Sequence, residues 1–100
     1  MDMLEQIRHQ LQNSFAPSHL EVFNESHMHR VEPGSQSHFK AVVVSEAFEG
    51  LRTLKRHQQV YAALSGEMPL IHALALHTYT PGEWAERGEA PKTPNCRGGG

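Results

Sequence analysis

Cysteine and aspartate are almost absent from this 100-residue chain, which contains one of each. The single cysteine, Cys96, has no partner for an intramolecular disulfide, so the fold depends on its hydrophobic core alone. The only aspartate, Asp2, is not part of a Ser-His-Asp set. The sequence also has no glycine-rich phosphate loop and no pair of carboxylates in an apolar setting. The sequence therefore predicts a protein that is not an enzyme.

Long apolar runs are also missing. No stretch approaches the ~20 residues that span a bilayer. Charges recur every few positions in the first twelve residues, where a signal peptide would be apolar. We therefore expect a cytoplasmic protein without membrane contact. With 38% hydrophobic and 20% charged residues, the chain suits one small domain with a single core.

Positive charge is scarce overall, because the formal net charge is −2. This excludes a uniformly basic nucleic-acid binder. The first fifty residues hold three basic and seven acidic side chains, whereas the last fifty hold six basic and four acidic ones. Any surface that faces phosphates is therefore predicted in the second half.

Hydrophobic spacing predicts three helices and three strands. Residues 2–14 form an apolar stripe at helical spacing, with Asp2 and Glu5 in a capping-box pattern. Strands are expected at 19–25, 39–45 and 71–79, and a long helix at about 51–67, with Leu54 and Tyr61 on its core side. Residues 80–83, Thr-Pro-Gly-Glu, open the last helix. A loop is expected at 26–37.

This element order, α-β-β-α-β-α, predicts a two-layer α+β domain. The first two strands pair antiparallel, and the long helix is a crossover that makes the third strand parallel to the second. The result is a three-stranded mixed sheet with helices on one face. We expect residues 1–87 to form this single domain and residues 88–100 to be a disordered tail.

The chain closely resembles the BolA family. The resemblance rests on Ser37-His38-Phe39-Lys40, on Phe48-Glu49-Gly50 followed by Leu54, Arg56-His57 and Tyr61, and on the strand from Ile71 to Thr80. It implies a KH-like fold of the second topological class, which agrees with the predicted element order. RNA-binding KH domains clamp RNA with a Gly-x-x-Gly loop. No two glycines here stand three apart, so the KH-like fold is no evidence for such binding.

The resemblance also implies a DNA-binding transcriptional regulator of stress response and cell morphology. Arg52, Lys55 and Arg56 form a basic stripe on the long helix and are the predicted phosphate contacts on double-stranded DNA. Gln59 is available for a base edge. The competing interpretation is that this stripe is only the solvated side of a helix. The sequence does not fix the oligomeric state, and a homodimer is compatible with it.

Eight histidines suggest a second function. Two imidazoles can replace two cysteines on one iron of a [2Fe–2S] centre, but this chain has no thiolate pair for the remaining positions. The resemblance implies a cluster shared with a monothiol glutaredoxin and glutathione, which supply the sulfur. It assigns His72 and His29 as the ligands, with His27 as a second loop candidate. We expect His57 to be a core residue bonded to backbone, and His9 and His19 to be idle.

Overall fold

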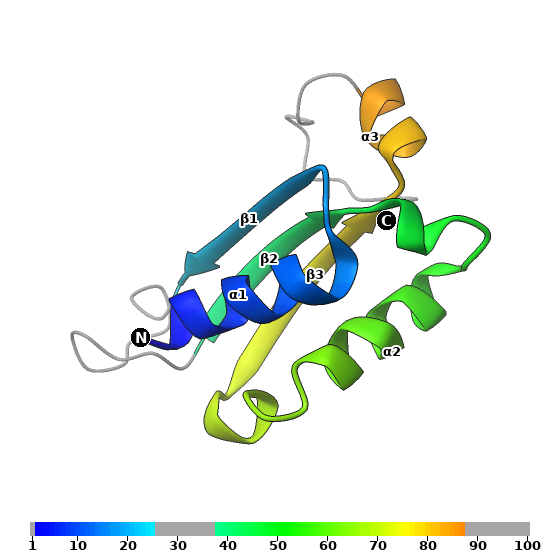
Figure 1. The fold of residues 1–100 in the computed structure, drawn as a ribbon. Helices are drawn as coiled ribbons and strands as arrows, with labels where there is room; N and C mark the ends of the chain where they lie inside the picture. Colours follow the sequence, from blue (N-terminus) through cyan, green and yellow to red (C-terminus); the bar gives the residue numbers. More distant parts are fainter. Residues whose placement is uncertain (1, 26–37, 88–100) are drawn as a thin grey trace.

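Helices and strands follow one another in the predicted order (Figure 1). The computed structural model describes residues 2–25 and 38–87. The helices are α1 (Met3–Phe15), α2 (Thr53–Ala63) and α3 (Pro81–Arg87), and the strands are β1 (His19–Asn24), β2 (His38–Val44) and β3 (Ala73–Tyr79). Two short 3-10 turns, η2 (Glu46–Phe48) and η3 (Met68–Leu70), were not predicted. The expected loop at 26–37 and tail at 88–100 lie outside the described residues.

The sheet has the predicted mixed topology, with the strand order β1-β2-β3. β1 pairs antiparallel with β2, and His19 lies opposite Val44. β3 pairs parallel with β2, and His38 lies opposite Ala73. Because β2 is central, its Val42-Val43-Val44 run is buried on both faces, as expected of β-branched residues in an inner strand.

The helices α1 and α2 cover one face of the sheet (Figure 1). Asp2 caps α1 by accepting the Glu5 amide at 3.0 Å, which confirms one half of the predicted capping box. Phe48 of η2 is fully buried and its ring lies 5.2 Å from that of Phe15. The core beneath the helices consists of Ile7, Leu11, Phe15, Val22, Phe39, Ala41, Val43, Phe48, Val60, Leu64 and Leu76.

The buried side of α2 differs from the prediction. Leu54, which was expected in the core, is 68% exposed, and Tyr61 is also exposed. Arg56, Val60 and Leu64 are buried instead. Both sets recur at helical spacing and share the position of Leu64, so periodicity alone did not separate them. The face that carries Arg56, Val60 and Leu64 is the buried one, because the apolar stem of Arg56 packs inside and its charged end has a partner.

α3 is held by a reciprocal capping box, as predicted. The Glu83 amide donates to the Thr80 hydroxyl at 3.1 Å, and the Thr80 amide donates to the Glu83 carboxylate at 3.0 Å. Trp84 packs against a second cluster made by Val42, Val44 and Tyr79. These residues alternate with the main core along the strands, so α3 reaches the face that α1 and α2 leave open.

Candidate functional site

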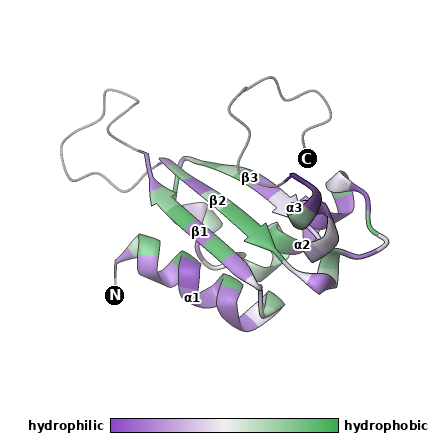
Figure 2. Ribbon diagram, turned by 90° about the horizontal axis from the view of Figure 1, so that it is seen from above, coloured by the Kyte–Doolittle hydropathy of each residue, from purple (hydrophilic) through white to green (hydrophobic). Residues whose placement is uncertain are grey.

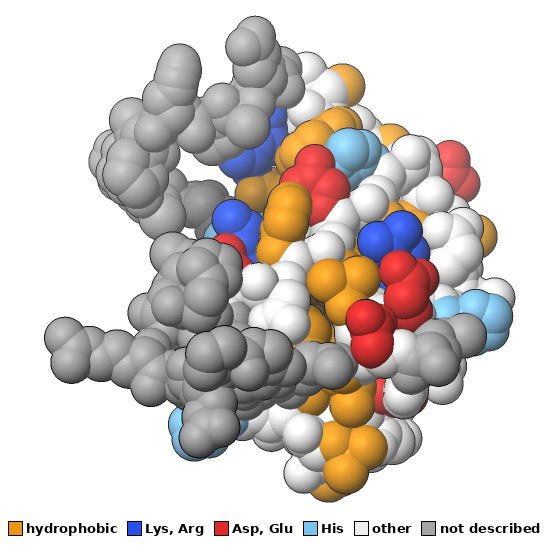
Figure 3. All heavy atoms as spheres, turned by 90° about the vertical axis from the view of Figure 1, so that its left-hand side faces the viewer, with side chains coloured by type: hydrophobic (Ala, Val, Ile, Leu, Met, Phe, Trp, Pro, Cys, Tyr) orange, Lys and Arg blue, Asp and Glu red, His pale blue; other side chains and the backbone are white. Residues whose placement is uncertain are grey.

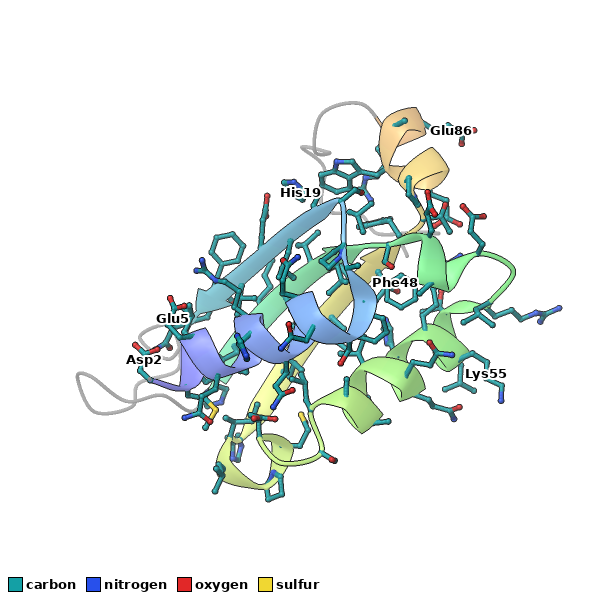
Figure 4. All side chains as sticks on the ribbon, viewed as in Figure 1. Asp2, Glu5, His19, Phe48, Lys55 and Glu86 are labelled. Atoms are coloured by element: carbon teal, nitrogen blue, oxygen red, sulfur yellow. The ribbon has the colours of Figure 1, made fainter. Side chains whose placement is uncertain are left out.

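Three of the predicted DNA-contacting residues, Arg52, Lys55 and Gln59, are exposed on or beside α2. Neither cation has an ion-pair partner among the described residues. Lys55 projects away from the domain (Figure 4). The helix itself, TLKRHQQVYAA, contains no acidic residue. This surface is therefore locally basic although the chain as a whole is slightly acidic.

The amino end of α2 adds to this surface. Arg52 occupies the N-cap position, and no side chain caps the first amides. Gly50 has a φ of 78°, which turns the chain sharply between η2 and α2 and favours glycine. Helix amino ends carry partial positive charge and attract phosphate oxygens. The uncapped end and the two cations therefore lie together.

Arg56 is not part of this exposed surface, which corrects the prediction that it contacts DNA. The residue is only 7% exposed. Its guanidinium donates to both carboxylate oxygens of Glu83, at 2.7 and 2.9 Å, and to the Leu51 carbonyl at 2.8 Å. The hydrogen bonds from Arg56 are the largest cause of a lowered pKa at Glu83. Arg56 therefore links α2 to the capping box of α3.

His72 lies at the opposite end of the sheet, immediately before β3, and its side chain is exposed. Its ring lies 4.9 Å from the ring of His38, centre to centre. The parallel register explains the pair, because His38 lies opposite Ala73. Among the described residues no group of three or more metal-binding side chains occurs. The two loop candidates, His27 and His29, lie outside the described residues.

The pairing of His72 with His38 was not assigned from the sequence. The only signal available was indirect, because His38 immediately preceded the predicted second strand and His72 lay at the start of the predicted third strand, which runs parallel to it. Two imidazoles at one sheet end provide nitrogen donors to a metal ion or cluster. No thiolate lies among the described residues, so sulfur ligands have to come from another molecule.

Two histidines predicted to be structural or idle behave otherwise. His57 was expected to bond to backbone, but its Nε2 atom is buried and lacks a hydrogen-bond partner. Burial, followed by the charges of His77 and Arg56, lowers its pKa. His19 was expected to be idle, but its Nε2 lies 2.7 Å from the Glu21 carboxylate and its ring stacks on Trp84 at 4.8 Å.

The geometry defines a small α+β domain with a basic helix surface at one end and a histidine pair at the other. The family described as "BolA-like protein" matches residues 11–83. The chain belongs to this family, as the sequence resemblance indicated.

Several relatives extend over nearly the whole chain. The "DNA-binding transcriptional regulator BolA" of Vibrio cholerae is 50% identical over 95 residues, which cover 93% of this chain and 90% of that protein. The protein of the same name from Escherichia coli K12 is 46% identical over 102 residues, covering 100% and 97%. The solution structure of BolA1 from Mus musculus has a TM-score of 0.81 at 40% identity and covers 97% of this chain and 80% of that chain.

No helix among the described residues is long and apolar enough to cross a membrane.

Proposed function

We propose that this protein is a cytoplasmic, non-catalytic regulator of transcription that binds double-stranded DNA and acts in stress response and cell morphology. The observation that carries the proposal is the pair of exposed cations, Arg52 and Lys55, on a helix without acidic residues. Relatives that match over nine-tenths or more of their length are named DNA-binding transcriptional regulators.

Recognition begins with the phosphate backbone. Arg52 and Lys55 neutralise phosphates, and the uncapped amides at the start of α2 donate hydrogen bonds to a phosphate oxygen. Gln59 lies four residues beyond Lys55, on the same side of the helix, and its amide can pair with a base edge. Phosphate contacts supply affinity, whereas the Gln59 contact supplies sequence preference.

The test is duplex binding over a range of salt concentrations. Replacing both Arg52 and Lys55 with glutamine should lower affinity for all duplexes and reduce the log–log salt slope by about 2. Gln59→Ala should relax preference among sequences and leave the salt slope unchanged. Arg8→Gln is the control, because Arg8 is exposed on α1, away from this surface. An equal loss for Arg8→Gln would contradict the proposal.

A second candidate function, which is compatible with the first, is favoured by the His38–His72 pair. We propose that the protein shares a [2Fe–2S] cluster with a monothiol glutaredoxin and glutathione. The donor set fits this role, since the chain offers imidazoles and the partner offers thiolates. His72 is the fixed ligand at the sheet end, and His29, with His27 as its neighbour, is the loop ligand. Ligation requires neutral imidazole, so protons compete with assembly.

The proximity of His38 to His72 changes the design of the test. Purified protein is mixed anaerobically with a monothiol glutaredoxin carrying a cluster, and visible absorption and EPR are recorded. His72→Ala should remove the histidine signature, and so should the His27/His29 double substitution. His38→Ala shows whether His38 is a ligand or only a neighbour of His72. His9→Ala is the control on α1. Spectra unchanged by His72→Ala would refute the ligand assignment.

A further inference from the structure

Within residues 2–25 and 38–87, no helix other than α3 at one end lies on the face of the sheet opposite α1 and α2 (Figure 2). Strand alternation assigns its side chains, because Leu20, Val22 and Val43 point into the main core. The residues on the open face are His19, Glu21 and Phe23 from β1, His38, Lys40, Val42 and Val44 from β2, and Ala73, Ala75, His77 and Tyr79 from β3. At one end Trp84 of α3 packs on this face.

Two cations of this face lack an ion-pair partner among the described residues. Lys40 places its Nζ atom 5.5 Å from the centre of the Phe23 ring. The Arg87 guanidinium lies 4.3 Å from the centre of the Tyr79 ring, and its Nε atom is buried without a hydrogen-bond partner. Cations held over aromatic rings keep donors directed toward solvent or a ligand. Lys40 lies opposite Ala75, and Arg87 lies over Tyr79, which is four residues, or about 13 Å, further along β3.

Two carboxylates lie on or beside this face. Glu21 is 2.7 Å from His19, and Glu25 follows the end of β1. At the centre of the face, burial lowers the pKa of His77, and the charges of Lys40 and Arg87 lower it further against the opposing charge of Glu25. The cations thus outweigh the nearby carboxylate at this position. Acidic, basic, histidine and hydrophobic side chains are interspersed on the side of the molecule drawn in Figure 3, which is the β1 side of Figure 1.

Between Lys40 and Arg87 the sheet carries small side chains that extend little above the backbone. Ala73 and Ala75 are exposed, and Lys40 lies opposite Ala75. Phe23, across β2 from them, is 42% exposed. Apolar exposure here is divided among separate small groups, which is too little for stable docking of a protein helix. The Phe23 ring, the His77 imidazole and the two cations instead suit a single strand, whose unpaired bases can stack on a ring while its phosphates contact the cations.

We propose that this open face binds single-stranded DNA. Bases stack on Phe23 and lie over Ala75 toward His77, and Lys40 and Arg87 hold the phosphates. Duplex DNA does not fit this role, because its bases already stack on one another and cannot reach the rings. The proposal concerns a surface distinct from the α2 surface and does not depend on it.

The test uses two pairs of matched substitutions. Binding of fluorescein-labelled dT12 is followed by fluorescence anisotropy at low salt. Phe23→Ala and Lys40→Gln should each weaken binding at least about fivefold, at the lower end of the stacking range. The controls, Tyr61→Ala on α2 and Arg8→Gln on α1, should change it less than twofold, because neither residue belongs to a proposed DNA-binding surface. Tyr61 is as exposed as Phe23, at 41%, so general loss of apolar surface is matched.

The same four variants and Lys55→Gln are then measured on a duplex hairpin, where Lys55→Gln should weaken binding and Lys40→Gln should not. If only the duplex measurements fail to show these changes, the proposal for the α2 surface is contradicted and the proposal for the open face is not. Lack of saturable binding to dT12, or losses from the two controls equal to those from Phe23→Ala and Lys40→Gln, would overturn the proposal that the open face binds single-stranded DNA. Binding of rU12 more than tenfold tighter than dT12 would overturn the assignment to DNA. Circular dichroism establishes that each variant is folded.

Discussion

Arg56→Gln tests whether the buried arginine stabilises the fold or contacts DNA. The substitution removes the two bonds to Glu83 and the bond to the Leu51 carbonyl, and it also removes a longer 3.4 Å contact with the Thr78 carbonyl. Glutamine is a polar side chain of similar width, so the substitution does not create a large cavity in the core beside Val60. The loss therefore reports mainly on the hydrogen bonds.

The expected magnitude follows from these contacts. Hydrogen bonds to a charged group contribute about 1.5–3 kcal/mol each when buried. The Glu83 side chain is 45% exposed, so water screens the ion pair and its contribution falls to about 1 kcal/mol. The carbonyl of Leu51, left without its partner, adds about 1–3 kcal/mol, which gives a total loss of about 2–4 kcal/mol. For a domain of this size, each 1 kcal/mol lowers Tm by roughly 4–8 °C.

The assay is thermal and urea unfolding of Arg56→Gln, Glu83→Gln and the double variant. The double-mutant cycle should give a coupling of about 1 kcal/mol between the two residues. Arg52→Gln should leave Tm unchanged, since Arg52 is exposed and unpaired among the described residues. A Tm loss below about 4 °C for Arg56→Gln would refute the structural role.

The pH dependence of stability gives a second check on the role of Arg56. Glu83 has a lowered pKa, so its contribution is present above the unfolded-state pKa of about 4.5. That contribution disappears as pH falls through the folded-state value and should be smaller in Arg56→Gln.

Two further predictions concern the core and the histidines. Leu64→Ala should cost about 2–5 kcal/mol of unfolding free energy in urea, whereas Leu54→Ser should cost less than about 0.5 kcal/mol because Leu54 is exposed; similar losses would contradict the assignment of the buried face. His57 and His77 both have lowered pKa values, chiefly through burial, so the unfolded chain binds more protons and stability should fall as pH drops below about 6.5. Urea midpoints at pH 7.5 and 5.5 should differ less in the His57→Gln/His77→Gln variant, and an unchanged difference would contradict the argument.

The fold could be predicted because its local signals agree with its packing. Asp2 and Thr80 cap helices through bonds whose partners lie three residues away, so sequence spacing is sufficient to identify them. The β-branched run of β2 identified the central strand, and the length of the following helix required a crossover. These features depend on neighbours in the chain and on general chirality rather than on individual long-range contacts.

The site was less predictable because its features depend on residues distant in sequence. Arg56 is buried only because Glu83, 27 residues later, provides a carboxylate. Without that contact, an arginine on a helix is most simply interpreted as solvated or as a phosphate contact. The His38–His72 pair likewise depends on strand register, and a shift of one residue would send the side chains to opposite faces.

The two proposed functions occupy opposite ends of the domain, and this separation constrains how one could regulate the other. Arg52 precedes α2, whose eleven residues span about 16 Å. The chain then turns through η3 before reaching His72, so the helix carries it from the basic surface toward the histidine pair (Figure 1). A glutaredoxin bound at His72 therefore does not replace the DNA contacts of Arg52 and Lys55 residue for residue. Its size alone offers a way to block duplex DNA, because a second domain of similar dimensions, with a radius of gyration of about 13 Å, reaches beyond its point of attachment. If the partner regulates DNA binding, steric overlap with the bound duplex would therefore suffice, without a conformational change within this domain.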